Sequence, residues 1–102
     1  MTSPLPIRIV SSAARTIEEA AIWWKRNRTK APYAFAVDLE NALKLIASHP
    51  DIGVRAVNVS LEGVRRLHLA RIRYYLYYRV TSDQAVEVLA FWHTSHADSP
   101  NL

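Results

Sequence analysis

The chain has 102 residues, half of them hydrophobic, and its formal net charge is +4. It has no cysteine, which excludes disulfide scaffolds, iron–sulfur clusters and thiolate zinc sites. No stretch approaches the ~20 apolar residues that cross a bilayer, and residues 1–6 do not have the pattern of a signal peptide. We therefore expect one cytoplasmic domain over residues 1–102, with residues 1–6 and 97–102 flexible.

The first half of the chain predicts one strand and two helices. Residues 7–10 are a strand candidate, and Thr16-x-x-Glu19 resembles a capping box of a helix that begins there or a few residues earlier. Pro32 suits the first turn of a second helix, which ends at His49-Pro50. Apolar residues recur at helical spacing in both segments: Ile17, Ala20, Ala21 and Trp24, then Phe35, Leu39, Ala42, Leu43 and Ile46.

The second half predicts an antiparallel meander of strands. Residues 51–62 contain turn formers and a short extended piece around Val54, Val57 and Val59. Strands follow at about 64–70, 71–80 and 85–93. The predicted fold is α+β with the order βααβββ: one twisted antiparallel sheet with the N-terminal helical hairpin packed on one face.

The strand predicted over residues 71–80 separates into two faces by strict alternation. One face should pack under the helices: Ile72, Tyr74, Leu76, Tyr78 and Val80. The other should meet water or a partner: Arg71, Arg73, Tyr75, Tyr77 and Arg79, joined by Arg66 and His68 of the preceding strand. No acid occurs between Glu62 and Asp83, so this second face is expected to be cationic and aromatic. Such a face suits a large anionic partner, either nucleic acid or acidic protein.

Four segments of the chain, together with the order of its elements, form a recognisable pattern. They are Ala42-Leu43-x-x-Ile46-Ala47-x-His49-Pro50-x-Ile52-Gly53, Gly63-Val64-Arg65-Arg66-Leu67-His68-Leu69, Tyr74-x-Leu76-x-Tyr78-Arg79-Val80 and Val88-Leu89-x-x-Trp92-His93. In these segments the sequence resembles the ParE branch of the RelE/ParE superfamily, the toxins of bacterial type II toxin–antitoxin pairs. The resemblance extends from about Ile7 to His93 and rests on this distributed pattern rather than on one catalytic motif.

The resemblance implies a plasmid-stabilisation toxin that a cognate antitoxin neutralises. In this family the antitoxin's C-terminal segment, commonly acidic, wraps the toxin along its sheet and fills an apolar groove beside the helices. Trp23 and Trp92 are the candidate antitoxin contacts; for Trp23, a place in the core is the alternative.

Two activities occur in the superfamily. ParE-like members poison DNA gyrase, whereas RelE-like members cut mRNA on the ribosome without a metal. The second activity would assign catalysis to Arg66, His68 and His93. However, Tyr75 stands where the nuclease pattern has an arginine, and no tyrosine follows Trp92. A third possibility is a non-toxic protein-interaction module.

We therefore expect a gyrase inhibitor that acts by binding, with ribosomal mRNA cleavage as the alternative. It should need no cofactor and no metal, because His93-x-x-His96 lacks a third ligand. The predicted target-binding residues are Arg65, Arg66, His68, Arg71, Arg73, Tyr75, Tyr77 and Arg79.

Overall fold

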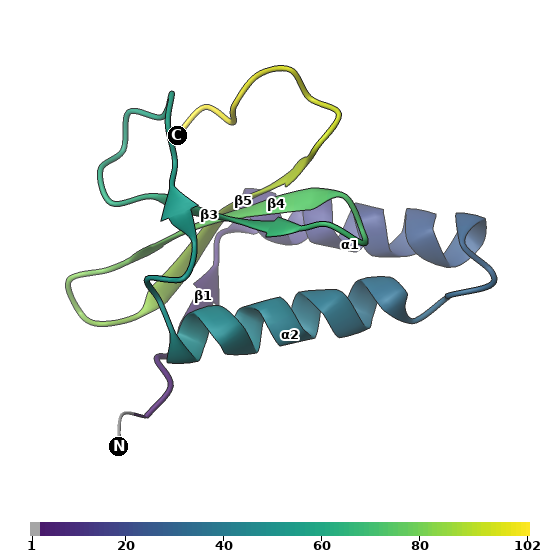
Figure 1. Cartoon of the computed structure of the whole chain (residues 1–102), viewed down its shortest axis with the longest axis horizontal. Helices are drawn as coiled ribbons and strands as arrows, with labels where there is room; N and C mark the ends of the chain where they lie inside the picture. Colours follow the sequence, from purple (N-terminus) through teal and green to yellow (C-terminus); the bar gives the residue numbers. More distant parts are fainter. Residues whose placement is uncertain (1–2) are drawn as a thin grey trace.

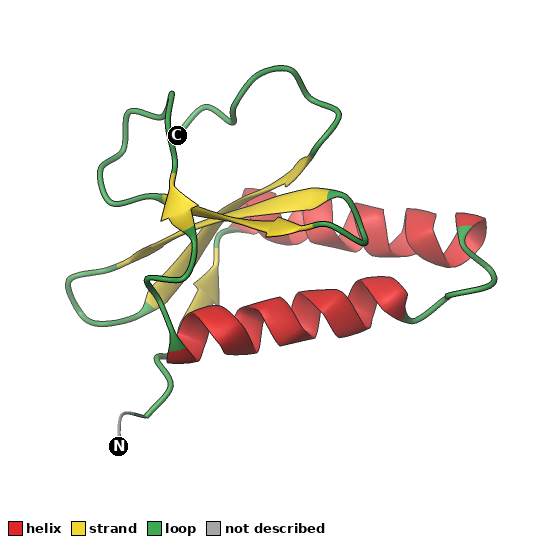
Figure 2. Cartoon of the chain, viewed as in Figure 1, coloured by secondary structure: helices red, strands yellow, loops and turns green. Residues whose placement is uncertain are grey.

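Two helices cover one face of a five-stranded sheet in the computed structural model, which describes residues 3–102 (Figure 1). The segment after the second strand and the C-terminal segment lie on the other side of the sheet (Figure 2). The elements in chain order are β1 (Ile7–Ile9), α1 (Ser11–Asn27), α2 (Ala34–Ser48), β2 (Val54–Arg55), β3 (Arg65–Leu69), β4 (Tyr74–Val80) and β5 (Val86–His93). The α+β class and the helical hairpin on one face are confirmed.

The sheet is mixed, whereas the sequence predicted an antiparallel one. Its strand order is β1-β5-β4-β3-β2, and β1 lies parallel to β5 while the other pairs are antiparallel. The difference arises from the connection that follows β1. Both helices lie between β1 and the other strands in sequence, and this long connection allows β1 to run parallel to β5. The short extended piece expected in residues 51–62 is β2, which pairs with the first two residues of β3.

The helices follow from the apolar periodicity, but α1 begins earlier than the capping box. Its first residue is Ser11, and no side chain caps it. Thr16 lies in the second turn, where its hydroxyl donates to the carbonyl oxygen of Ser12, so the capping-box interpretation is wrong. At the far end, the N–H of Arg28 donates to Trp24, and His49 closes α2 in the same way through Leu45.

A single hydrophobic core lies between the helices and the sheet. The ring of Phe35 in α2 is at its centre, edge-on to Phe91 of β5 with ring centroids 5.7 Å apart. Ile46, Leu76, Tyr78, Val86 and Val88 are all 0% exposed. Other buried members are Ala13, Ala20 and Trp24 of α1, Ala34 and Ala42 of α2, and Leu69 and Ile72.

The sequence predicted the boundary between β3 and β4 at residues 70 and 71, and the structure has a longer turn there, because β3 ends at Leu69 and β4 begins only at Tyr74. The φ of Arg73 is +66°, which is rare for a side-chain-bearing residue, and its N–H donates to the carbonyl of Leu69. Arg71 and Arg73 therefore do not belong to the outward row of β4, contrary to the prediction. Val80, at the other end of β4, is 38% exposed rather than buried.

The ends of the described chain are attached by backbone hydrogen bonds. Leu5 donates to Ala47, the carbonyl of Pro6 accepts from Val86, and the carbonyl of Leu102 accepts from Ser60. The flexibility predicted for residues 1–6 and 97–102 stays a prediction, and residues 1 and 2 lie outside the described part.

Candidate functional site

The sheet face turned away from the helices brings together four of the predicted site residues. Arg66 and His68 come from β3 and Tyr75 from β4, and Trp92 of β5 lies opposite Tyr75 in the strand register. The Arg66 guanidinium lies over the Tyr75 ring, 4.1 Å from its centroid, and the His68 ring is 5.0 Å from the same ring. We call Arg66, His68 and Tyr75 the sheet cluster.

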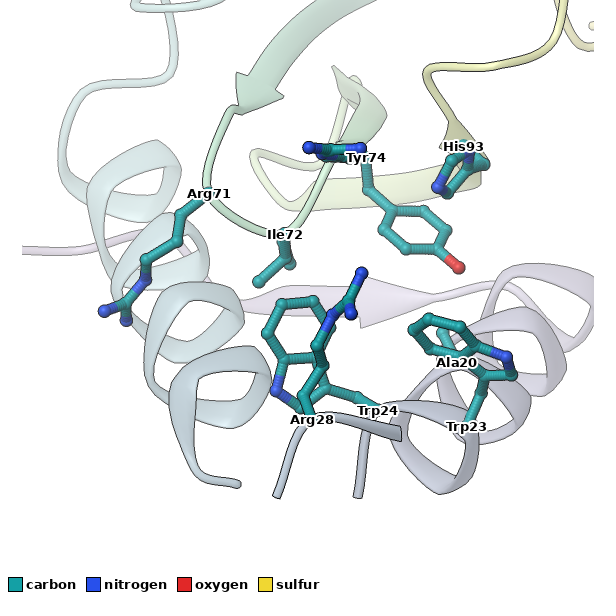
Figure 3. A pocket seen from close by; sticks show the side chains of 9 residues that line it. Ala20, Trp23, Trp24, Arg28, Arg71, Ile72, Tyr74 and His93 are labelled. Atoms are coloured by element: carbon teal, nitrogen blue, oxygen red, sulfur yellow. The ribbon is translucent and has the colours of Figure 1, made fainter. Parts of the chain in front are cut away.

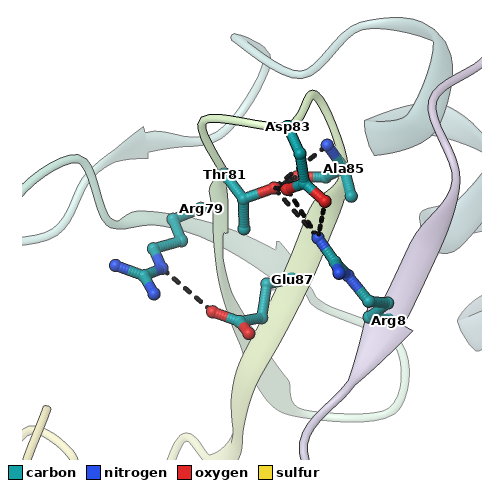
Figure 4. Close-up of polar contacts among 6 residues, drawn as sticks. All are labelled: Arg8, Arg79, Thr81, Asp83, Ala85 and Glu87. Carbon is teal, nitrogen blue, oxygen red and sulfur yellow. Dashed lines mark hydrogen bonds and ion pairs between the residues drawn. The ribbon is translucent and has the colours of Figure 1, made fainter.

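Three of the predicted cations are paired with acids from elsewhere in the chain. Arg79 donates to Glu87 of β5 across 2.9 Å (Figure 4). Arg71 donates two hydrogen bonds to Asp38 of α2, and these raise the pKa of Arg71 above its usual value. Arg65 lies 4.0 Å from Asp51. The acid-free run of residues 63–80 therefore does not give an acid-free surface, because folding supplies the partners.

Arg65 is also held by backbone oxygens. Its guanidinium donates to the carbonyls of Gly53 and Asp51, at 2.8 and 3.3 Å. Arg66 and Arg73, by contrast, have no ion pair with any residue of 3–102. These two are the predicted site arginines with charge available to a partner.

Tyr77 was predicted to face water or a partner, but the structure buries it. Its side chain points to the same side as Tyr75 but is only 2% exposed. The segment after β2 and the C-terminal segment lie over this side of the sheet, where Ser60 donates to Leu102 (Figure 1). Alternation gives the side on which a residue points, but not what distant segments cover it.

The three candidate nuclease residues are not gathered in one place. His93 pairs in register with Tyr74, and its ring is edge-on to that ring at 5.0 Å, on the helix side of the sheet. Arg66 and His68 project from the opposite side. His93 Nδ1 lies 2.7 Å from the Ser95 hydroxyl.

Trp92 anchors the C-terminal segment instead of standing free. Its indole N–H donates to the carbonyl of Asp98 at 2.9 Å, and its ring stacks on His96 with centroids 4.3 Å apart. Trp23, the other candidate antitoxin contact, is 51% exposed on α1 and is not part of the core.

A cavity of about 600 Å³ opens at the end of α1, and sequence reasoning did not find it. It lies between α1, the β3–β4 turn and the end of β5 (Figure 3). The Arg28 guanidinium stacks over the Trp23 and Trp24 rings, at 5.4 and 5.8 Å from their centroids. The sequence does contain an indication of this cavity. Arg28 continues the helical spacing of Ile17, Ala20, Ala21 and Trp24, and it is the one charged residue in that series.

The cavity is lined by aromatic and cationic side chains and by no Asp or Glu. Its lining residues are Ala20, Trp23, Trp24, Arg28, Arg71, Ile72, Arg73, Tyr74 and His93. Elsewhere, residues 3–102 hold no group of three or more His, Cys, Asp or Glu that could bind a metal. No helix within those residues is both long and apolar enough to cross a membrane.

Comparisons with known proteins found a matching family and a matching fold. A family model described as the ParE toxin of type II toxin–antitoxin system, parDE, matches residues 7–97. A solved structure described as the chromosomal ParDE TA system from P. aeruginosa superposes with a TM-score of 0.70. That likeness covers 89% of this chain and 97% of that chain at 18% sequence identity, so it shows a shared fold. No curated protein matches the sequence.

Proposed function

This chain belongs to the ParE family of toxins of type II toxin–antitoxin systems, and we propose that it acts by binding DNA gyrase and stabilising the cleaved-DNA state. The observation that carries the proposal is the sheet cluster, in which the Arg66 guanidinium lies against the Tyr75 ring and has no acidic partner among residues 3–102. Arginine and tyrosine on a rigid sheet are typical of energetically dominant interface residues.

The separation of His93 from the sheet cluster favours binding over bond cleavage. A general acid or base must come within hydrogen-bond reach of the reacting group. Arg66 and His68 lie on one side of the sheet and His93 on the other, an arrangement that does not favour a common role for the three at one scissile phosphate.

We also propose that an acidic antitoxin segment neutralises the toxin in the cytoplasm. Trp23 offers an exposed aromatic ring for such a segment, and the net charge of +4 favours an acidic partner. Trp92 is the weaker candidate of the two, because its indole N–H already donates to Asp98.

The test is induction of the chain in bacteria without antitoxin, with the DNA-damage response and the translation rate followed together. We expect early DNA damage while translation continues, and accumulation of cleaved DNA when the purified chain is added to gyrase. Arg66→Glu should abolish both effects in a folded protein. The matched control is Arg15→Glu, which reverses an exposed arginine on α1, away from the sheet cluster.

Two results would overturn the proposal. Immediate translation arrest with cut mRNA would indicate a RelE-like nuclease. A folded chain that causes no growth defect would indicate an interaction module.

A further inference from the structure

We propose that the cavity at the end of α1 binds one nucleotide unit, with its phosphate on Arg73 and Arg28 and its base against Trp23. This site is separate from the sheet cluster, and the inference goes beyond gyrase binding. The shared ligand chemistry is a planar base joined to a phosphate, and it is supplied either by a free nucleotide or by an unpaired nucleotide of a strand.

The cavity has the charge that a phosphate requires. Arg28 and Arg73 have no ion pair within residues 3–102, whereas Arg71, the third arginine of the lining, points toward α2 and is bound by Asp38 (Figure 3). Guanidinium groups match phosphate oxygens in a planar, two-pronged geometry. Two guanidinium groups that have no acidic partner within the described residues therefore favour a phosphate over a neutral ligand at this cavity.

The hydroxyl of Tyr74 supplies a further donor. It points from the sheet toward α1, on the side where Arg28 and Trp23 lie (Figure 3). Burial raises the pKa of Tyr74 above its usual 10.0, so the phenol is protonated at neutral pH and can donate to an anion.

The walls of the cavity are held in place before any ligand arrives. The Trp24 indole N–H donates to the Ala31 carbonyl at 2.8 Å, and the Tyr74 ring stacks on Phe91 with centroids 4.2 Å apart. The N–H of Arg73 donates to Leu69, and its carbonyl accepts from Thr94. A preformed site loses little conformational entropy on binding.

In the chain without its antitoxin, the half-exposed indole of Trp23 can stack on a base, so the cavity favours a nucleotide over a simple carboxylate. A carboxylate would satisfy the arginines alone, but it would leave the indole without a stacking partner. Every base has a face that stacks favourably on an aromatic ring. The volume of about 600 Å³ also suits one small ligand rather than a folded element.

The test is calorimetric titration of the purified chain with AMP, adenosine and inorganic phosphate at low salt. We expect AMP to bind more tightly than either of its parts. Arg73→Gln and Trp23→Ala should each weaken AMP binding about tenfold, the loss expected for one charged hydrogen bond or one stacked base. The matched controls are Arg15→Gln and Ile22→Ala. They remove an exposed arginine and an exposed apolar side chain of α1 that do not line the cavity.

A second set of titrations separates the two sources of the ligand. If an eight-nucleotide single strand binds at least as tightly as AMP, the ligand is an unpaired nucleotide of a strand. If the strand binds more weakly than AMP or not at all, the ligand is a free nucleotide. Both results support the proposal. No AMP binding, wild-type AMP affinity in both cavity variants, or binding of a glutamate-rich peptide in place of AMP would overturn it. No gyrase is present in these titrations, so failure here is distinct from failure of the gyrase proposal.

Discussion

The backbone N–H of Gly53 donates a 2.9 Å hydrogen bond to the hydroxyl of Tyr78. The same hydroxyl donates to the carbonyl oxygen of Pro50 at 2.7 Å. Tyr78 is 0% exposed, so one buried phenol satisfies a donor and an acceptor of the loop that follows α2. The Gly53 carbonyl in turn accepts from Arg65, and the loop is thereby fastened to both β3 and β4.

Tyr78→Phe should lower the free energy of unfolding by about 2 kcal/mol, because it leaves the buried N–H of Gly53 and the half-buried carbonyl of Pro50 without their partner. Urea unfolding followed by circular dichroism measures this change. Leu76→Ala provides the comparison, since it removes a fully buried side chain without touching these hydrogen bonds. A Phe variant as stable as the wild type would show that the loop does not depend on the phenol.

The same phenol should make the protein sensitive to alkali. Burial is the main cause that raises the pKa of Tyr78 above 10.0 in the folded state. The unfolded chain therefore loses this proton first as the pH rises. The stabilisation is fully present below pH ~10 and is lost as the pH passes through the higher folded value. The free energy of unfolding should thus fall less steeply above pH ~10 in Tyr78→Phe than in the wild type, and equal slopes would contradict this assignment.

Gly53→Ala should destabilise the fold by about 1–3 kcal/mol, the usual cost of overpacking. An added Cβ would lie 2.8 Å from the Tyr78 hydroxyl oxygen and 3.0 Å from the Arg66 carbonyl oxygen. Combining it with Tyr78→Phe should cost less than the sum of the two changes, because removal of the hydroxyl relieves part of the clash. Additive losses in denaturant unfolding would argue against this close approach.

Arg79→Glu should destabilise the sheet by about 1 kcal/mol, since it places two carboxylates side by side on β4 and β5. The partners are 35% and 24% exposed, so solvent screens part of the effect. The double variant Arg79→Glu with Glu87→Arg restores opposite charges and should recover most of the loss. If thermal unfolding shows no recovery, the pair does not contribute through its charge.

Asp83 should make stability depend on acid. Hydrogen bonds first from Thr81 and then from Arg8 hold the pKa of Asp83 below its usual 3.8 (Figure 4). The unfolded chain therefore takes up the proton first as the pH falls. The contribution is present above pH ~4 and is lost as the pH falls through the lower folded value. Asp83→Asn should flatten the dependence of the urea midpoint on pH between about 2 and 5. An unchanged pH profile would show that the hydrogen bonds of Asp83 do not contribute to stability in this way.

The sequence predicted the helices well because their signal is local. Phe35, Leu39, Ala42 and Ile46 recur at the helical period, and each is buried or half-buried in the structure. The sidedness of Leu76 and Tyr78 followed from alternation in the same way. The full extent of the turn at residues 70–73 could not be found like this, because Arg71-Ile72-Arg73 continues the alternation of the strand while Arg73 adopts a positive φ.

The site was less predictable because it depends on residues far apart in the chain. Arg71 meets Asp38 from a helix that lies 33 positions earlier, and Arg8 reaches Asp83 across 75 positions. Local composition shows neither pairing. The sequence therefore predicted that all the arginines of residues 63–80 could contact a partner, whereas several of them are paired with acids of the same chain. Arg66 and His68 were placed correctly on one face because that requires only the strand period.

The pairing of β1 with β5 has a consequence for synthesis. The register pairs Ile7 with Val86, Arg8 with Glu87 and Ile9 with Val88. The first strand to be synthesised therefore cannot pair until the last strand has been synthesised. Contacts this distant in sequence form late and slowly. A nascent chain on the ribosome therefore cannot close its sheet until residues 86–93 have emerged, and truncated translation products should be harmless to the cell that makes them.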